Sequence, residues 1–216
     1  MGAKTWTGVA VNMESASATA IVVNGITNAS PAVVTFTGTD PANGNVVFLE
    51  NISGIPEANN RPFRVAGLSA GVSFQLEGFD STLLGTYVTD SGTAKVKTLS
   101  NSFTTFLSFS GTGGEASEID ITTVHDTIDQ NVPGNKSAVG YSISSIWDPA
   151  DAGFAAMEVA DDDQINRVFE IRFSDNSRFY FGGRVSFLGA PTGDAGSRVE
   201  TPASISVQGR GTNYAT

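Results

Sequence analysis

The chain contains no cysteine, one histidine and few basic residues, and these shortages exclude several kinds of site. Without cysteine there is no disulfide framework, no thiolate nucleophile and no zinc site with sulfur ligands. The 12 Lys and Arg residues stand against 22 Asp and Glu, which gives a net charge of −10. A surface that binds nucleic acid tightly needs clustered basic side chains that contact the phosphates. The charge therefore argues against such a surface, but it is compatible with one that faces nucleic acid and repels it.

Long hydrophobic runs are also missing. No stretch approaches the ~20 apolar residues of a membrane helix, and the opening segment "MGAKTWTGVAVNM" has no apolar signal-peptide region. We therefore expect neither a membrane span nor a secretory leader. The 216 residues instead include 24 glycines and 40% hydrophobic residues, enough for a core interrupted by many turns.

Short runs of alternating apolar and polar residues predict a mainly β protein built of antiparallel strands. The strongest signal is a hairpin over residues 167–187, in which aromatic side chains alternate with polar ones on both sides of the turn "SDNS". One segment predicts a helix instead. Asp148 suits its N-cap, Phe154 and Met157 share one face, and we expect the helix to end near Ala160.

Charge divides the chain into two parts. Residues 23–97 hold six acidic and four basic residues, whereas the remainder holds 16 acidic and eight basic residues. We therefore expect a small all-β module at 23–97, inserted into a more acidic β domain made of residues 1–22 and 98–216.

Three motifs suggest chemistry, and none is sufficient for it. Residues 111–116, "GTGGEA", have the letters of a dinucleotide-binding fingerprint, but an alternating strand pattern follows where a helix is needed. A glycine-rich turn between two strands is the better interpretation. His125 beside Asp126 lacks the other parts of a triad, and the run Asp161–Asp163 lacks the spacing of a calcium loop. We expect no catalytic residue, no cofactor and no metal ion.

The order of segments in the second half of the chain carries a resemblance. Strands "EIDITTVHDT" and "GYSISSIWDP" are followed by the helix, by the hairpin "FEIRFSDNSRFYFGGRVSFLG" and by a closing strand "ASISVQGRG". This order, over about residues 98–216, resembles the tail tube proteins of long-tailed, siphovirus-like bacteriophages. Residues 23–97 are similar to a small β-barrel module found in various phage virion proteins.

The resemblance implies a fold and an assembly. The fold would be a tail-tube β-sandwich or barrel with one flanking helix, carrying the module on the tube exterior. Six subunits would form rings that stack into a tube, through which DNA and a tape-measure protein pass without sequence-specific contacts. Tail terminator and distal tail proteins would close the ends. The protein would be a virion component made in the host cytoplasm, and not an enzyme.

Alternation along the strands gives candidates for the channel lining. Ile119 and Ile121 are expected in the core, so polar residues on the opposite faces would line an acidic lumen that repels phosphate. These lumen candidates are Glu118, Asp120, Thr122, Glu170, Arg172, Ser204, Ser206 and Gln208. The loop at about 125–138 resembles the long loop by which the family reaches an adjacent subunit or ring. Its contact candidates are His125, Asp126, Asp129 and Lys136.

Two alternatives stay open on the sequence alone. A two-domain β binding module for carbohydrate or a cell surface is one, with Trp6, Trp147, Tyr141 and Tyr180 as candidate contact aromatics. The tube of a contractile machine, which shares the fold, is the other. The loop after residue 125 also has a competing interpretation as a mobile surface loop.

Overall fold

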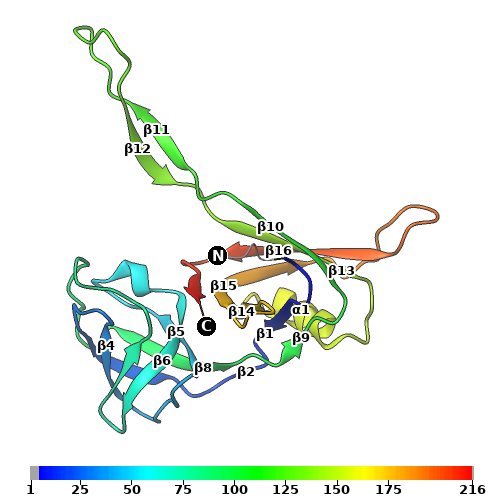
Figure 1. Ribbon diagram of the computed structural model, residues 1–216, viewed down its shortest axis with the longest axis horizontal. Coiled ribbons are helices and arrows are strands. Elements are labelled where there is room, and N and C mark those ends of the chain that lie inside the picture. The colour runs from blue at the N-terminus through cyan, green and yellow to red at the C-terminus, as the bar shows by residue number, and fades with distance from the viewer. Residues whose placement is uncertain (1–4, 216) are drawn as a thin grey trace.

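The computed structural model describes residues 5–215 of the chain. It contains one large sheet, one closed barrel, a two-stranded arm and a single helix in this range (Figure 1). The predicted fold class, mainly β with one helix and a small barrel, is confirmed.

The large sheet has eight antiparallel strands in the order β10-β13-β16-β15-β14-β1-β9, with β17 paired to the start of β15. The bounds are β1 (Ala10–Met13), β9 (Asn101–Ser102), β10 (Phe106–Thr112), β13 (Gly140–Ile146), β14 (Arg167–Arg172), β15 (Arg178–Phe187), β16 (Glu200–Val207) and β17 (Thr212–Tyr214). The hairpin predicted over residues 167–187 is confirmed as β14 and β15, with Phe169 directly opposite Phe181.

Helix α1 (Ala152–Asp163) covers one face of this sheet, and Phe154 and Met157 are buried as predicted. The predicted start was wrong. Asp151, not Asp148, is the N-cap, because its carboxylate accepts from the Gly153 and Phe154 amides and also from Thr104, which ties the cap to a distant segment. The predicted end near Ala160 was also wrong, since the helix continues to Asp163.

The barrel is closed by six antiparallel strands, because β5 pairs with both β6 and β8. They are β3 (Ile21–Ile26), β4 (Val33–Thr37), β5 (Val46–Glu50), β6 (Arg61–Ser69), β7 (Ser73–Leu76) and β8 (Gly92–Thr98). The short strand β2 (Ala16–Ser17) pairs with the end of β8, and the 3-10 helix η1 (Pro56–Ala58) follows β5. Closure leaves no free edge among these six strands. Their inward side chains form a core separate from that of the large sheet.

The barrel is packed against the large sheet through a buried junction. Val46 and Phe48 of the barrel form one apolar cluster with Val168, Tyr180 and Tyr214 of the sheet. A Cβ at Gly182 would lie only 2.6 Å from the Phe48 ring, so glycine is required for this close approach. The contact therefore holds the barrel at one position on the sheet.

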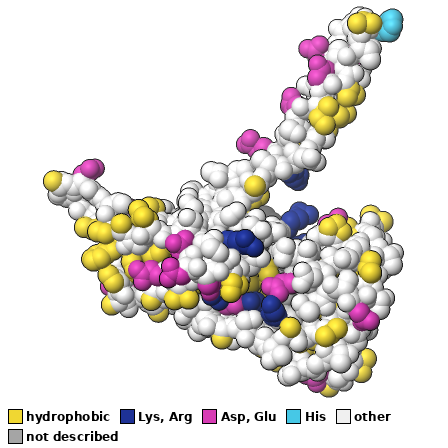
Figure 2. Space-filling model, turned by 180° about the vertical axis from the view of Figure 1, so that it is seen from behind, with side chains coloured by type: hydrophobic (Ala, Val, Ile, Leu, Met, Phe, Trp, Pro, Cys, Tyr) yellow, Lys and Arg dark blue, Asp and Glu magenta, His cyan; other side chains and the backbone are white. Residues whose placement is uncertain are grey.

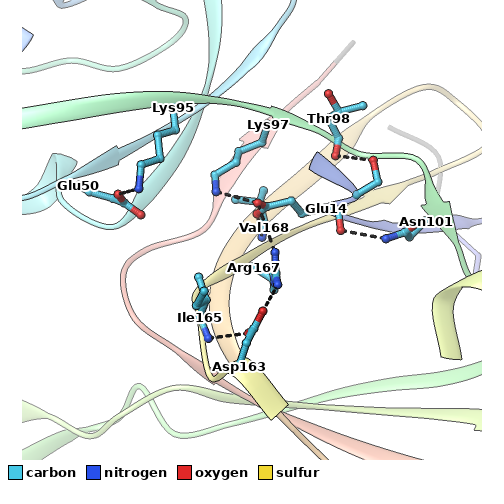
Figure 3. A network of polar contacts seen from close by, with 11 residues as sticks. Glu14, Glu50, Lys95, Lys97, Thr98, Asn101, Asp163, Ile165, Arg167 and Val168 are labelled. Atoms are coloured by element: carbon cyan, nitrogen blue, oxygen red, sulfur yellow. Dashed lines mark hydrogen bonds and ion pairs between the residues drawn. The ribbon is translucent and has the colours of Figure 1, made fainter. Parts of the chain in front are cut away.

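A buried ion pair reinforces the junction (Figure 3). Lys97 Nζ of β8 donates to Glu14 Oε1 at 2.8 Å, and both side chains are at most 4% exposed. Glu14 Oε2 accepts from the Val168 amide at 3.1 Å, and Arg167 lies 3.8 Å from Oε1. The carboxylate of Glu14 thus joins barrel and sheet through partners on both sides.

The C-terminal strand closes the junction from the other side. Tyr214 Oη accepts from the Arg64 amide at 2.7 Å, and the Arg64 guanidinium lies 4.5 Å from the centre of the tyrosine ring. Arg61 Nε donates to Thr212 Oγ1 at 2.9 Å, and that hydroxyl donates to the Pro62 carbonyl. The last described strand therefore fastens β6 to the large sheet.

Alkaline pH is expected to weaken this fastening. Burial raises the pKa of Tyr214 to about 12, above the usual value of 10. Because the folded pKa is the higher one, the stabilising contribution is complete below pH 10 and is lost as the pH rises from 10 to about 12, by about 2 kcal/mol. Urea unfolding at pH 9, 10, 11 and 12 measures this loss. Tyr214→Phe, which cannot ionise, should lose less stability over that interval, and an equal loss in both proteins would contradict the assignment.

The arm is a long two-stranded extension of the large sheet, made of β11 (Ala116–Asp120) and β12 (Asn131–Lys136), and we use "the arm" for residues 116–136. It projects far from the body of the protein (Figure 1). The expected turn at residues 111–116 was wrong, because the chain does not reverse there: β10 pairs with β13, and β11 pairs with β12. Gly113 and Gly114, both with positive φ, bend the ribbon between these two pairings.

Candidate channel face and assembly surfaces

Cross-strand register separates the two faces of the large sheet, because directly opposed residues point to the same side. Val185, Ile205 and Tyr141 lie opposite one another and belong to the core that includes α1. The neighbouring row, Ser186, Ser204 and Ser142, points to the other side. The sheet is thus apolar toward the helix and polar on its outer face.

The outer face is lined by serine hydroxyls over β10, β13, β16 and the end of β15. We call this surface the hydroxyl face; its serines are Ser108, Ser110, Ser142, Ser144, Ser186, Ser204 and Ser206. All are exposed except Ser144, which is half-buried and donates to Glu200. Of the lumen candidates, Ser204 and Ser206 lie on this face, and Gln208 follows it as an exposed residue.

Glu170 was expected to face a lumen, and the structure contradicts this. Its side chain is buried and accepts from Asn12 Nδ2 at 2.9 Å and from Arg178 and Tyr180, each at 3.0 Å. Tyr180 is its cross-strand partner and belongs to the cluster under the barrel. Packing of the barrel therefore removes this part of the outer face from solvent, whereas Arg172, at the end of β14, stays exposed.

The remaining lumen candidates lie on or beside the arm, away from the hydroxyl face. Glu118 accepts from Asn131 Nδ2 at 3.2 Å across the ribbon. Asp120 accepts hydrogen bonds from the side chain and backbone amide of Thr122, which lower the pKa of that carboxyl. The structure thus does not bring these three residues together with Ser204 and Ser206.

The arm exposes apolar side chains that alternation along the sequence placed in a core. Ile119 and Ile121 are 51% and 47% exposed, so that prediction was wrong: a two-stranded ribbon has no second layer to cover them. Val124 and Ile128 near the tip are 96% and 78% exposed. Exposed apolar side chains that lie close together are typical of protein contact surfaces.

The predicted contact residues lie at the tip and base of the arm. Asp126 accepts from the Thr123 amide and hydroxyl, both at 2.8 Å, and these bonds lower the pKa of its carboxyl and order the tip. His125 and Asp129 are exposed there, and Lys136 is exposed at the base. The one histidine thus lies exposed at the end of a ribbon, and residues 5–215 contain no group of acids and histidine arranged to hold a metal.

The aromatic residues considered for a binding module form no common platform. Tyr180 is buried at the junction. Trp6 packs against Phe106, Phe109 and Phe173, with ring centres 5.7–6.1 Å apart. Trp147 donates from Nε1 to the Gly189 carbonyl at another end of the sheet. Tyr141 packs against Phe109, the ring that Trp6 also contacts, and both Phe109 and Tyr141 border the core of the large sheet. The four candidate aromatics are therefore divided among three places.

Comparison with known families identifies the class of protein. A profile described as phage tail tube protein, TTP, matches residues 53–216. The chain belongs to this family. The match spans α1, the arm and every strand of the large sheet except β1, and it also includes the last three barrel strands, β6, β7 and β8. No curated protein matches the chain.

Membership of the tail tube family makes the protein a structural component of a phage tail, and it implies assembly into a tube. The only helix within residues 5–215 is too short to cross a membrane.

Proposed function

We propose that this tail tube protein forms homo-hexameric rings that stack into the tube of a flexible, siphovirus-like tail, with the hydroxyl face lining the channel. The supporting observation is that face itself: a four-stranded surface of exposed serines on the side of the sheet opposite α1. DNA and a tape-measure protein pass over it, and terminator and distal tail proteins bind the tube ends. The protein is made in the host cytoplasm and acts in the virion without catalysis.

A hydroxyl lining suits the passage of DNA. Phosphate binds tightly where several Lys or Arg side chains release counterions. On the exposed part of the hydroxyl face the charged side chains are Arg184, opposite Ser206, and Glu200, which is held by Ser144 and Arg198. The proposed channel is therefore close to neutral, rather than acidic as the sequence suggested.

The strand edges support ring formation. β10 is the edge strand of the large sheet, with no partner on its outer side. Where β15 extends past its pairing with β14, its free side is covered instead, since Gln164 Nε2 donates to the Val185 carbonyl and the Phe187 amide donates to Asp161. An open edge favours pairing with another subunit. In this arrangement the arm contacts an adjacent subunit or ring. The barrel lies on the same side of the sheet as the hydroxyl face, but over β14 and the start of β15. Because neighbouring strands twist relative to one another, we place this end of the sheet away from the channel axis, with residues 23–97 as an inserted module on the tube exterior.

Size-selective labelling tests which face lines the channel. Because the chain has no cysteine, Ser108→Cys, at an exposed position of the hydroxyl face away from its arm end, introduces a unique thiol. In assembled tubes this thiol is expected to react with a small maleimide, and at least tenfold more slowly with a maleimide on a large polymer that cannot enter the channel. Monomers should react with both reagents.

The matched control is Leu83→Cys, at a 97%-exposed position in the barrel. It should react with both reagents before and after assembly. Negative-stain microscopy establishes that hollow tubes with six-fold end views are present. Equal polymer labelling of Ser108→Cys in tubes and monomers would refute the channel assignment.

A further inference from the structure

A hollow lies on the large sheet where the arm leaves it. Its volume is about 300 Å³, and it is lined by apolar side chains such as Val139, Tyr141 and Ile205 and by serines of the hydroxyl face, Ser204 and Ser206 among them. It therefore occupies the arm end of the hydroxyl face, where the proposed channel wall of one ring would meet the next ring. The floor is thus partly apolar and the wall carries hydroxyls. We call it the arm-base hollow.

The rim of the arm-base hollow carries unpaired positive charge. Arg184 lies directly opposite Ser206, and Lys136 is two residues from Ala138, which also lines the hollow. Both side chains are exposed, and neither forms an ion pair with a residue in the described part of the chain. Six of the other basic residues do form such pairs, so these two are available for a partner.

The opposite end of the same strands carries the complementary features. The loop between β15 and β16, residues 188–199, projects from the end of the sheet opposite to the arm (Figure 1), and we call it the projecting loop. Leu188 at its start is 77% exposed, and Val199 at its end is 44% exposed. Asp194 near its middle is exposed and has no ion pair with a described residue. The loop thus presents an apolar base and a free carboxylate.

Further unpaired acids surround the base of the projecting loop. Glu158 lies beside Gly189, and Asp162 is exposed in the last turn of α1. Acidic side chains at a helix C-terminus are unfavourable, because the helix dipole is negative there. An incoming cation would relieve this repulsion. Figure 2 shows acidic side chains gathered around this end and basic ones near the arm base.

We propose that the projecting loop of one copy of this chain docks at the arm-base hollow of the next copy. Leu188 fills the hollow, and the acids around it face Arg184 and Lys136. The charges of the two surfaces are opposite, and a protrusion meets a concavity. Because the surfaces differ and lie on opposite ends of one sheet, the contact is head-to-tail and repeats from copy to copy. The inference rests on the proposed tube assembly and names the surfaces that join its subunits.

Disulfide trapping tests the contact in the cysteine-free chain. The double variant Leu188→Cys/Ser206→Cys places one thiol on each proposed surface. Under mild oxidation of assembled protein, non-reducing gels should show a ladder of covalent oligomers beyond the dimer. Each single variant lacks one of the two surfaces and should give no ladder.

The matched control replaces Leu188→Cys with Leu83→Cys, which is exposed on the barrel, and should also give no ladder. The docking proposal is overturned if this control pair gives an equal ladder, or if Leu188→Cys/Ser206→Cys forms tubes without a ladder. In either case the proposed tube function stands. Both the docking proposal and the tube function are contradicted if the folded protein forms neither tubes nor ladders. This holds for every tested salt concentration, with or without virion tail extract as initiator.

Discussion

Lys97→Met is expected to lower the free energy of unfolding by about 3 kcal/mol. The substitution leaves the Glu14 carboxylate buried without its closest cation, and removing one partner of a buried pair costs about 3–5 kcal/mol. We expect the low end of this range, because Arg167 remains 3.8 Å from Glu14 Oε1. Urea unfolding followed by circular dichroism measures the change, and proteolysis at the junction should accelerate with it.

The double variant Glu14→Gln/Lys97→Met is the control for this prediction. It removes both charges, while the glutamine oxygen can still accept from the Val168 amide that now binds Glu14. The double variant should therefore recover most of the lost stability. The pair of Lys95 with Glu50 is matched in charge but half-buried and partly open to solvent, and Lys95→Met should cost less than about 1 kcal/mol. Equal losses at Lys97 and Lys95 would contradict the role assigned to the buried pair.

Alternation along the sequence was reliable where each strand has a covered and an uncovered side. Phe169 and Phe181 lie on one face of the hairpin as predicted, and both are buried in the core that includes α1. The same reasoning failed for Ile119 and Ile121. Alternation states that neighbouring side chains leave opposite sides of a strand, but it does not state whether a second layer covers either side. On the arm no second layer exists.

The candidate channel residues also differ in whether another part of the protein covers them. Ser204 and Ser206 point outward as their alternation indicates, and the full hydroxyl face became visible only when strand register joined four strands. Glu170 has the same orientation in its strand, yet it is buried beside the junction. The contact of Phe48 with Gly182 that helps to bury this region joins residues far apart in the chain. Such long-range packing leaves no local pattern for sequence reasoning to detect.

The resemblance supplied what local patterns could not. It placed a small barrel within the chain and gave the protein its class. The family match over residues 53–216 shows the class, and the closed barrel of the structure is consistent with the expected module. The structure adds that the barrel is fixed by a buried junction instead of being tethered by its linkers. In an assembled tube the six barrels of each ring would therefore occupy defined positions, which predicts ordered density for them in averaged images.

The arm is expected to be required for assembly but not for folding. Val124→Ser/Ile128→Ser removes the two most exposed large apolar side chains of the arm, which contact no core in the single subunit. The free energy of unfolding should therefore change by less than about 0.5 kcal/mol. If an adjacent subunit buries both side chains, their loss costs about 3 kcal/mol per contact, so the critical concentration for tube formation should rise about 100-fold. Sedimentation of tubes across a concentration series measures this shift.

A matched pair on the barrel separates a specific contact from a general loss of hydrophobic surface. Leu83→Ser/Val88→Ser removes side chains that are 97% and 55% exposed, on a module that we place outside the tube wall. The critical concentration should stay within about twofold of the unmodified protein, because no neighbour covers these residues in the proposed arrangement. If the barrel pair raised it as much as the arm pair does, nonspecific adhesion and not the arm would explain assembly. If neither pair changed it, the arm would be a mobile surface loop, and the subunit contacts would have to come from the β10 edge and the arm-base hollow.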